Sequence, residues 1–390
     1  MKIHRVKEGD SVFSIAREYA VPPTKIIESN TLSNPDNLSV GQQLLILTPT
    51  RTHTVRGSDT LKGIAERFSI RTSDLIAKNP SLHGENSIYP GQILTIKSDT
   101  PPYGIAFAHG YIYKGTSLER LKSFLPYLTY VSVSAGKILR DDVKLLFDDS
   151  KVVEAVRASG KIPLLHLHSE SGAARLDEAV IDTAILLAKA RGYDGLTLTV
   201  NNINDYEEYS KFLLELKKTL MEYDLILFVD IDKNSSARIK ESYDGILLSF
   251  SKAQSKNPES FDSCERKIFT DFANESESSK AYIELSPFAF ANNEAITVDE
   301  ALKLAYSGRC EILYDEDTKL CQFDCNRYSF GRKNPTRVVF ESLENVKAKL
   351  DLVCELGYMG ISIDIQRCPM SYALMFDCLF RQSHCITPLY

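Results

Sequence analysis

The sequence predicts an α/β protein in which two small strand-helix-helix-strand (βααβ) modules precede a parallel (β/α)8 barrel of the TIM type. The pattern of residues 4–46 recurs in residues 53–96. Between residues 103 and 365, eight apolar runs of strand length alternate with longer stretches of helical periodicity. The chain has 390 residues, 43% hydrophobic and 25% charged, which is enough to bury both kinds of core.

Each repeat contains the signals for one complete module. A short strand leads to a turn, residues 9–11 in the first copy and 58–60 in the second, where Asp and hydroxyl side chains suit a helix N-cap. Apolar residues then recur at helical spacing, and a second helix ends at an asparagine in both copies. A closing strand follows the letters VGQ or PGQ.

The two repeats resemble LysM, a small module that binds glycans containing N-acetylglucosamine, such as peptidoglycan and chitin. The likeness covers residues 2–48 and 52–97, although Ser58 stands where the family usually has glycine. In this family the sugar lies across the loop after the first strand and the loop before the last strand. The resemblance implies a glycan-binding set of Gly9, Asp10, Ser11, Val12, Phe13, Asn37, Leu38, Ser39, Val40, Ser58, Asp59, Thr60, Leu61, Ser87, Ile88 and Tyr89.

The long C-terminal part follows a linker at residues 98–103, where two prolines stop any regular element. Because its eight predicted strands alternate with helices, they are expected to form a parallel barrel over residues 104–390. Functional side chains of such barrels lie where the strands end. The expected strands are residues 103–110, 128–135, 162–168, 195–200, 225–231, 245–251, 281–288 and 360–365.

Four segments of this part resemble the family 18 glycoside hydrolases, in particular the LysM-bearing spore proteins that include cortex-lytic N-acetylglucosaminidases. Residues 125–136 and 192–200 fit the second and fourth strands of that family. Residues 296–317 fit its inserted segment, and residues 337–363 fit its last helix and strand. The resemblance therefore implies a family 18 barrel and a spore-associated role.

The acid-bearing strand of that family is degenerate in this chain. The family motif D-x-x-D-x-D-x-E ends on the glutamate that protonates the leaving oxygen, and the preceding aspartate orients the substrate's own acetamido nucleophile. An amide or a threonine cannot act as a general acid. The four motif positions read Asp194, Thr197, Thr199 and Asn201.

The sixth and last strands depart from the family as well. Phe250 and Ser251 replace a tyrosine and an aspartate that hold the acetamido group, and the chain contains no tryptophan to form the floor under the sugar. The resemblance thus implies a family 18 barrel without its catalytic residues.

Other polar residues at strand ends leave a second interpretation open. Two strand-end carboxylates could form a relocated acid/base pair, chosen from Asp230, Asp232, Glu284 and Asp364.

Three histidines, His109, His166 and His168, also lie near predicted strand ends. A spacing of two residues places the last two on one face of their strand, where a pair of histidines can hold a metal. Because no carboxylate motif accompanies them, hydrogen-bonding roles are favoured for all three.

The cysteines indicate neither a disulfide framework nor a zinc site. All eight follow residue 263, and we expect reduced thiols. Neither Cys321 with Cys325 nor Cys385 beside His384 matches the paired spacing of zinc ligands. We therefore expect no metal and no cofactor.

The charge and the N-terminus limit the partners. A net charge of −6 argues against nucleic acid and anionic membranes, and no apolar run approaches the roughly 18 residues of a membrane span. The first residues contain no uninterrupted apolar segment of a signal peptide, so we expect synthesis and retention on the cytoplasmic side.

Three hypotheses for function remain. The first is a non-catalytic protein of the spore coat or cortex of an endospore-forming bacterium, bound to peptidoglycan or a related glycan. The second is an active N-acetylglucosaminidase of spore cortex that uses relocated carboxylates. The third is a coat scaffold whose barrel face binds spore coat proteins.

Overall fold

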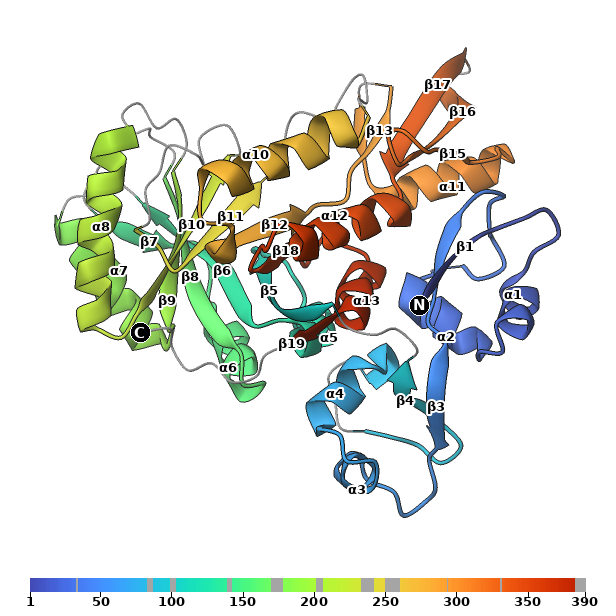
Figure 1. Cartoon of the computed structure of the whole chain (residues 1–390), viewed down its shortest axis with the longest axis horizontal. Coiled ribbons are helices and arrows are strands. Elements are labelled where there is room, and N and C mark those ends of the chain that lie inside the picture. Colours follow the sequence, from blue (N-terminus) through green and yellow to red (C-terminus); the bar gives the residue numbers. More distant parts are fainter. Residues whose placement is uncertain are drawn as a thin grey trace.

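The computed structural model describes residues 1–32, 34–82, 87–98, 103–138, 142–169, 178–200, 206–232, 242–249, 260–292, 294–329 and 332–382. It contains two small modules, a closed barrel and a small antiparallel sheet inserted near the end of the barrel (Figure 1). The predicted fold class is confirmed. Among the described residues, every helix is too short or too polar to cross a bilayer.

The first module is a two-stranded antiparallel sheet with two helices. Its elements are β1 (Lys2–Arg5), α1 (Val12–Glu18), α2 (Pro23–Asn30) and β2 (Gln43–Ile46). Helix α1 begins after Ser11, whose side chain accepts a hydrogen bond from the backbone of Ser14, while Ser14 caps it in return. Its core is made of Val6, Val12, Ile15, Ala16, Val21, Ile26, Leu44 and Ile46.

The second module repeats this architecture. Its elements are β3 (Pro49–Thr54), α3 (Leu61–Arg67), α4 (Thr72–Ala77), the 3-10 turn η1 (Pro80–Leu82) and β4 (Ile93–Ser98). In both modules the asparagine predicted to end the second helix ties that helix to the closing strand. Asn30 donates to Ile26 and Leu45 and accepts from Leu45, and Asn79 makes the equivalent three bonds.

The barrel closes from eight parallel strands, each hydrogen-bonded to its neighbours. The first strand pairs with both the second and the last, through His109 opposite Tyr130 and Ser362. In order around the barrel the strands are β5 (Gly104–Ile112), β6 (Tyr130–Ile138), β8 (Ile162–Ser169), β9 (Gly195–Val200), β10 (Ile226–Asp232), β11 (Gly245–Ser249), β12 (Ala281–Leu285) and β18 (Gly360–Asp364).

Helices cover the outside of the barrel (Figure 1). They are α5 (Leu118–Phe124), η2 (Leu125–Tyr127), α6 (Ser150–Ala158), α7 (Glu178–Arg191), α8 (Tyr206–Glu222), η3 (Asp262–Arg266), α10 (Lys267–Glu275), η4 (Ser278–Lys280), α12 (Leu343–Glu355) and α13 (Met370–Leu379). Two short strands, β7 (Val143–Leu145) and β19 (Phe380–Gln382), pair with β6 and β5.

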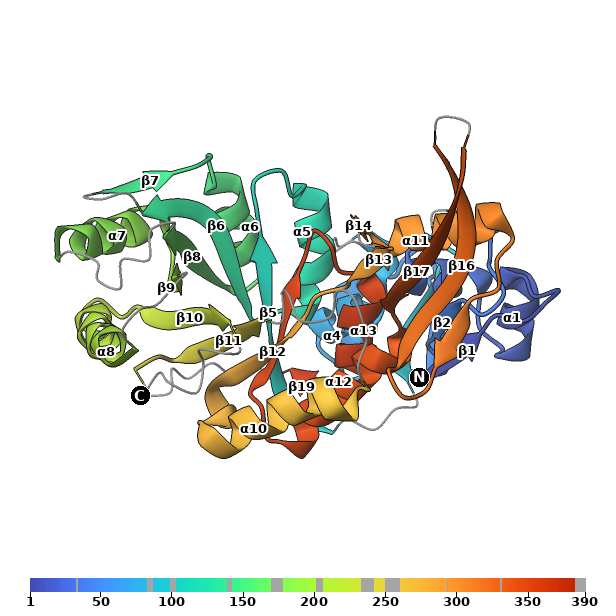
Figure 2. The same ribbon diagram turned by 90° about the horizontal axis from the view of Figure 1, so that it is seen from above.

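An insertion interrupts the barrel between β12 and α12. It is a five-stranded antiparallel sheet with one helix, and its long hairpin of β16 and β17 projects from the molecule (Figure 2). Its elements are β13 (Ala289–Ala291), β14 (Glu294–Ile296), α11 (Val298–Gly308), β15 (Leu313–Asp315), β16 (Leu320–Ser329) and β17 (Arg332–Glu341).

A buried ionic cluster joins the insertion to the barrel. The ammonium group of Lys349 on α12 lies 2.6 Å from Glu341 at the end of β17 and 3.2 Å from Glu265 in η3. Tyr372 donates to Glu341, and Asn345 donates to Glu265. Because all three charged side chains are buried, each depends on its partners for the hydrogen bonds that water would otherwise supply.

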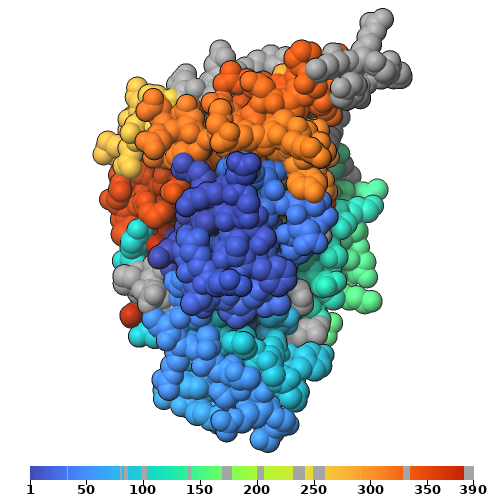
Figure 3. Space-filling view, turned by 90° about the vertical axis from the view of Figure 1, so that its right-hand side faces the viewer, coloured from blue at the N-terminus to red at the C-terminus, as the bar shows by residue number. Residues whose placement is uncertain are grey.

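Both modules pack against the rest of the molecule. In the space-filling view the first module lies directly against the insertion, and the second lies below it (Figure 3). Leu45 of the first module and Ala77 of the second belong to the barrel's own hydrophobic core, and Tyr127 of the barrel donates to the carbonyl of Ala77. Lys25 donates to Asn79 and connects the modules to each other.

Candidate functional site

The turn after the first strand has the same internal bonding in both modules. Asp10 accepts from the ring of His4 at 3.0 Å and from the backbone of Lys7 at 2.8 Å. Asp59 accepts from His53 at 2.7 Å and from the backbone of Arg56 at 2.9 Å. These bonds lower the pKa of both carboxyl groups, so each aspartate holds its turn as an anion.

The loop before the last strand is also duplicated. Gln42 accepts from the backbone of Ser39, and Gln92 accepts from the backbone of Tyr89, both at 3.1 Å. A glycine with positive φ precedes the glutamine in each copy, with φ of +84° for Gly41 and +88° for Gly91. The two predicted grooves are therefore built on matching backbone frames.

The rims of the two grooves differ in their exposed aromatic side chain. Phe13 of the first module and Tyr89 of the second are each 70% exposed. Each ring belongs to the predicted glycan-binding set, but Phe13 comes from the first loop and Tyr89 from the second. Exposed aromatic rings of this kind offer an apolar face to a sugar ring.

The surroundings of the two grooves differ more strongly. In the first module the carbonyl of Val40 accepts from the backbone of Ile312 in the insertion at 2.8 Å. A Cβ on Gly41 would lie 1.8 Å from the carbonyl oxygen of Ile312, whereas a Cβ on Gly91 would meet no atom of the described residues within 4 Å. The first groove thus has a second wall.

Within the barrel, two of the positions predicted to match the acidic motif, Thr197 and Thr199, hydrogen-bond to neighbouring polar side chains. Asp194 lies before the strand and pairs with Arg157 on the outside, at 2.8 Å. Thr197 contacts Ser132 at 2.6 Å, and Ser132 contacts His109 at 2.6 Å. The hydroxyls at these positions therefore belong to the polar packing of the barrel interior.

Thr199 is the residue that the sequence predicts at the position of the orienting aspartate. Its hydroxyl donates to Asp230 at 2.9 Å and contacts the ring of His166 at 2.7 Å. Asn201, Phe250 and Ser251 lie outside the described residues, so their predicted roles remain sequence predictions.

The three barrel histidines are uncharged groups in a buried setting. Burial lowers the pKa of His109 to about 3, and it also lowers the pKa values of His166 and His168. His168 contacts the hydroxyl of Ser134 at 2.6 Å, and its ring centre lies 3.9 Å from that of His166. Within the described ranges, no group of three or more His, Cys, Asp or Glu side chains is placed to hold a metal ion.

The relocated carboxylates have unequal surroundings. Asp364 accepts from the backbone of Gln366 at 2.9 Å and of Arg367 at 3.2 Å, which makes it the cap of the turn after β18. Burial nevertheless raises its pKa. Glu284 lies two residues after the inward-facing Tyr282 on β12, so alternation directs it toward the barrel interior. The side chain of Asp232 lies outside the described set.

Two tyrosines complete the mouth, and the sequence analysis missed them. Tyr111 and Tyr113 stack with their ring centres 6.4 Å apart. Burial, together with the nearby charges of Asp230 and Glu284, raises the pKa values of both phenols. The period-two spacing from His109 to Tyr111 and Tyr113 was the signal that could have placed them inside the barrel.

The cysteines of the described residues are all free thiols. The possible zinc ligands Cys321 and Cys325 lie in the apolar core of the insertion. Burial raises the pKa of Cys321 to about 12. A thiol with a raised pKa is a poor metal ligand near neutral pH. Cys385 and His384 lie outside the described residues.

Comparison with known proteins identifies the two modules. The family model of the LysM domain matches residues 4–47 and 53–97, so the chain carries two LysM domains. The expected repeat is thereby confirmed.

For the remainder of the chain, solved structures show the fold. The spore cortex-lytic enzyme SleL of Bacillus cereus superposes with a TM-score of 0.75 at 19% identity, over 98% of this chain and 99% of that one. A glycoside hydrolase family 18 N-acetylglucosaminidase from Paenibacillus barengoltzii superposes with a TM-score of 0.57 at 14% identity, over 70% of this chain and 100% of that one. The barrel therefore has the fold seen in these hydrolases.

A relative by sequence is the putative sporulation-specific glycosylase YdhD of Bacillus subtilis (strain 168). It is 26% identical over 257 residues, which is 61% of this chain. The chain spans only 60% of the length of that relative.

Proposed function

We propose that this protein is a glycan-binding protein of bacterial spores whose LysM domains hold it on peptidoglycan and whose barrel does not cleave the sugar chain. The ligand class follows from the LysM domains, and the spore setting from the similarity to SleL and YdhD. The site of action under this proposal is the spore coat or cortex.

The network around Thr199 is the observation that carries the proposal for the barrel. In a substrate-assisted hydrolase this position needs a carboxylate to orient the acetamido group. Here a hydroxyl is held between the ring of His166 and the carboxylate of Asp230. Neither this residue nor Asn201, two positions later, can supply or hold the required charge.

A second candidate is an active glycosidase with relocated carboxylates, and one observation favours it. Burial raises the pKa of the Tyr113 phenol, and the negative charges of Asp364, Glu284 and Asp230 raise it further. Two of them stand on neighbouring strands, since β12 carries Glu284 and β18 carries Asp364. However, the carboxylate of Asp364 accepts two backbone hydrogen bonds in the turn after β18, and this structural role makes it a weaker candidate for the general acid.

The third candidate, a coat scaffold that binds spore coat proteins, uses the same LysM anchor. It differs in giving the barrel surface a protein ligand, and the protruding β16–β17 hairpin is the feature that favours it (Figure 2). Failure of the whole chain to capture any spore coat protein would argue against this candidate, and capture that survives shortening of the hairpin would show that the contact lies elsewhere on the barrel.

Cosedimentation of the whole chain with insoluble spore peptidoglycan tests the anchoring role. The double variant Phe13→Ala with Tyr89→Ala removes one exposed ring from each LysM domain. It should weaken retention about 5- to 150-fold, since aromatic contacts of this kind contribute about 0.5–1.5 kcal/mol each. Tyr223→Ala is the control, because Tyr223 is 44% exposed and lies outside both modules. Unchanged retention of the double variant would refute LysM-mediated binding.

A further inference from the structure

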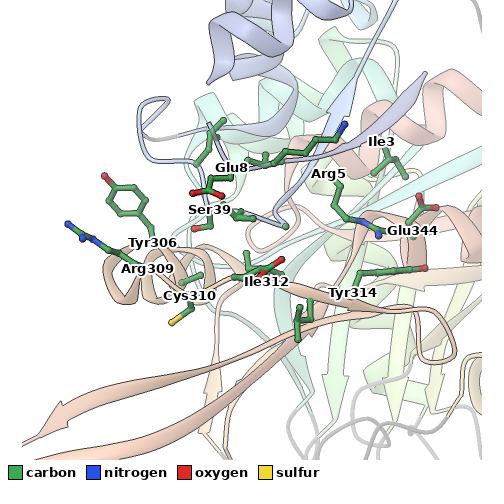
Figure 4. Close-up of a pocket in the computed structure, with 18 residues that line it drawn as sticks. Ile3, Arg5, Glu8, Ser39, Tyr306, Arg309, Cys310, Ile312, Tyr314 and Glu344 are labelled. Carbon is green, nitrogen blue, oxygen red and sulfur yellow. The ribbon is translucent and has the colours of Figure 1, made fainter. Parts of the chain in front are cut away.

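The first LysM domain and the barrel insertion enclose a cleft. Its volume is about 1070 Å³, and it is lined by Ile3, Arg5, Val6, Lys7, Glu8 and residues 38–41 on one side and by residues 305–306 and 309–314 with Glu344 on the other. Figure 4 shows Glu8 and Ser39 of the module with Tyr306, Arg309 and Ile312 of the insertion across from them. Three members of the predicted glycan-binding set, residues 38–40, line it.

The walls of the cleft are fixed to each other. Besides the bond from Ile312 to Val40, the guanidinium of Arg5 lies 4.5 Å from the ring centre of Tyr314 in β15. The backbone of Glu344 on α12 donates to Gln43 of β2 at 3.3 Å. The module therefore cannot open away from the insertion without losing backbone and side-chain contacts.

A buried hydroxyl in the cleft lacks a partner. Ser39 is only 5% exposed, and its hydroxyl oxygen has no hydrogen-bond partner among the described residues. Its counterpart in the second module is Tyr89, which is 70% exposed on an open surface. A buried polar group without a partner calls for an explanation, and a ligand that hydrogen-bonds to it would supply one.

The lining suits a sugar chain. Leu38, Val40 and Leu313 offer apolar surface, while the exposed ring of Tyr306 and the polar ends of Glu8, Arg309 and Glu311 stand at the rim. Apolar surface with a few placed polar groups is the usual lining of a small-ligand site. The volume lies at the upper end of the range for such sites, which fits an extended ligand.

We propose that the insertion completes the glycan groove of the first LysM domain, so that this domain holds an N-acetylglucosamine-containing chain between two walls. The second domain binds the same class of ligand on an open surface. The two domains are then unequal sites, and the contribution of the barrel region to binding comes from its insertion. This inference rests on the proposed glycan-binding function.

Calorimetric titration of the whole chain with a chitin hexamer tests the inference. A Tyr89→Ala background weakens the second domain, so that the remaining binding reports the first. In that background Ser39→Ala should weaken binding about 3–10-fold, the equivalent of one lost hydrogen bond, without lowering the melting temperature of the free protein. Tyr306→Ala should weaken binding about 2–10-fold, with Tyr223→Ala unchanged.

Gly41 and Gly91 allow a matched pair of substitutions that tests the contact between the first LysM domain and the insertion. Gly41→Ala and Gly91→Ala impose the same strain at positive φ, but only the first also drives a Cβ into Ile312. In the same background Gly41→Ala should lower hexamer affinity at least about 10-fold relative to Gly91→Ala.

The outcomes separate the two proposals. If the unmodified protein does not bind the hexamer, the glycan-binding function itself is wrong. A different result would overturn only the composite groove. In that case the unmodified protein binds the hexamer and Phe13→Ala weakens binding, but Ser39→Ala and Tyr306→Ala bind as tightly as the background variant. The glycan-binding function would then stand.

Discussion

A carboxylate placed at position 199 should destabilise the protein, because the hydroxyl there now lies against the carboxylate of Asp230. In Thr199→Asp, a carboxylate oxygen would replace a hydroxyl that now lies 2.9 Å from Asp230. Two unit charges about 3 Å apart at an effective dielectric constant of about 20 repel by roughly 5.5 kcal/mol. Protonating one carboxylate instead costs about 4 kcal/mol at pH 7, given an ordinary pKa near 3.9.

We therefore expect Thr199→Asp to lower the free energy of unfolding by about 4 kcal/mol at pH 7, since the protein takes the less costly of the two routes. The penalty should fall by about 1.4 kcal/mol for each pH unit down to about pH 4, because the folded variant binds a proton more readily than the unfolded chain. Thr199→Asn is the matched control, since its amide is uncharged and can still donate to Asp230.

Urea denaturation of both variants at pH 7 and pH 5 provides the measurement. Equal stability of Thr199→Asp and Thr199→Asn at pH 7 would refute the reasoning, because it would mean that Asp230 does not face the introduced charge. A penalty that is the same at both pH values would refute it as well, because like-charge repulsion must weaken as one carboxyl group becomes protonated.

Two further predictions concern the barrel scaffold. Lys349→Met should lower the free energy of unfolding by about 3–5 kcal/mol in urea denaturation at pH 7, because it leaves the buried carboxylates of Glu341 and Glu265 without their cation. Lys347→Met on the same helix removes a half-exposed pair with Asp351 and should cost less than about 1 kcal/mol; equal losses for the two variants would contradict the buried cluster. The pKa of His109 is lowered to about 3 by burial, so the unfolded chain alone binds a proton between about pH 6.5 and pH 3, and stability is lost as pH falls through that window. The stability of the unmodified protein relative to His109→Gln should therefore fall by about 1.4 kcal/mol per pH unit between pH 6 and pH 4, and a pH-independent difference would show that His109 is protonated in the folded state.

Most of the fold could be predicted from local sequence patterns. The repeated turn and helix signals predicted both modules, since the cap of Ser11 is formed by a neighbour along the chain. The closing bonds of Asn30 and Asn79 stay within one module, to residues 15 and 16 positions away. The eight apolar runs predicted the barrel strands, because strands buried on both faces are marked by near-continuous apolar sequence.

The composite cleft could not be predicted from the sequence. It depends on Val40 meeting Ile312, two residues far apart in the chain whose contact leaves no periodic signal. The form of the insertion was likewise missed, because only residues 296–317 resembled a known segment while its sheet extends from Ala289 to Glu341. Position 199 was singled out by the resemblance to the family 18 motif, but its bonds to His166 and Asp230 required the tertiary structure.

Product analysis during incubation with peptidoglycan tests whether the barrel cleaves the glycan that the protein binds. The unmodified protein is incubated with spore peptidoglycan or chitin hexamer, and both the bound protein and any sugar released into the supernatant are measured, the latter by mass spectrometry. We expect the protein to be retained on the peptidoglycan with no new reducing ends. Release of sugar by the unmodified protein, abolished by Asp230→Asn or Glu284→Gln, would contradict this expectation and establish the barrel as an active glycosidase.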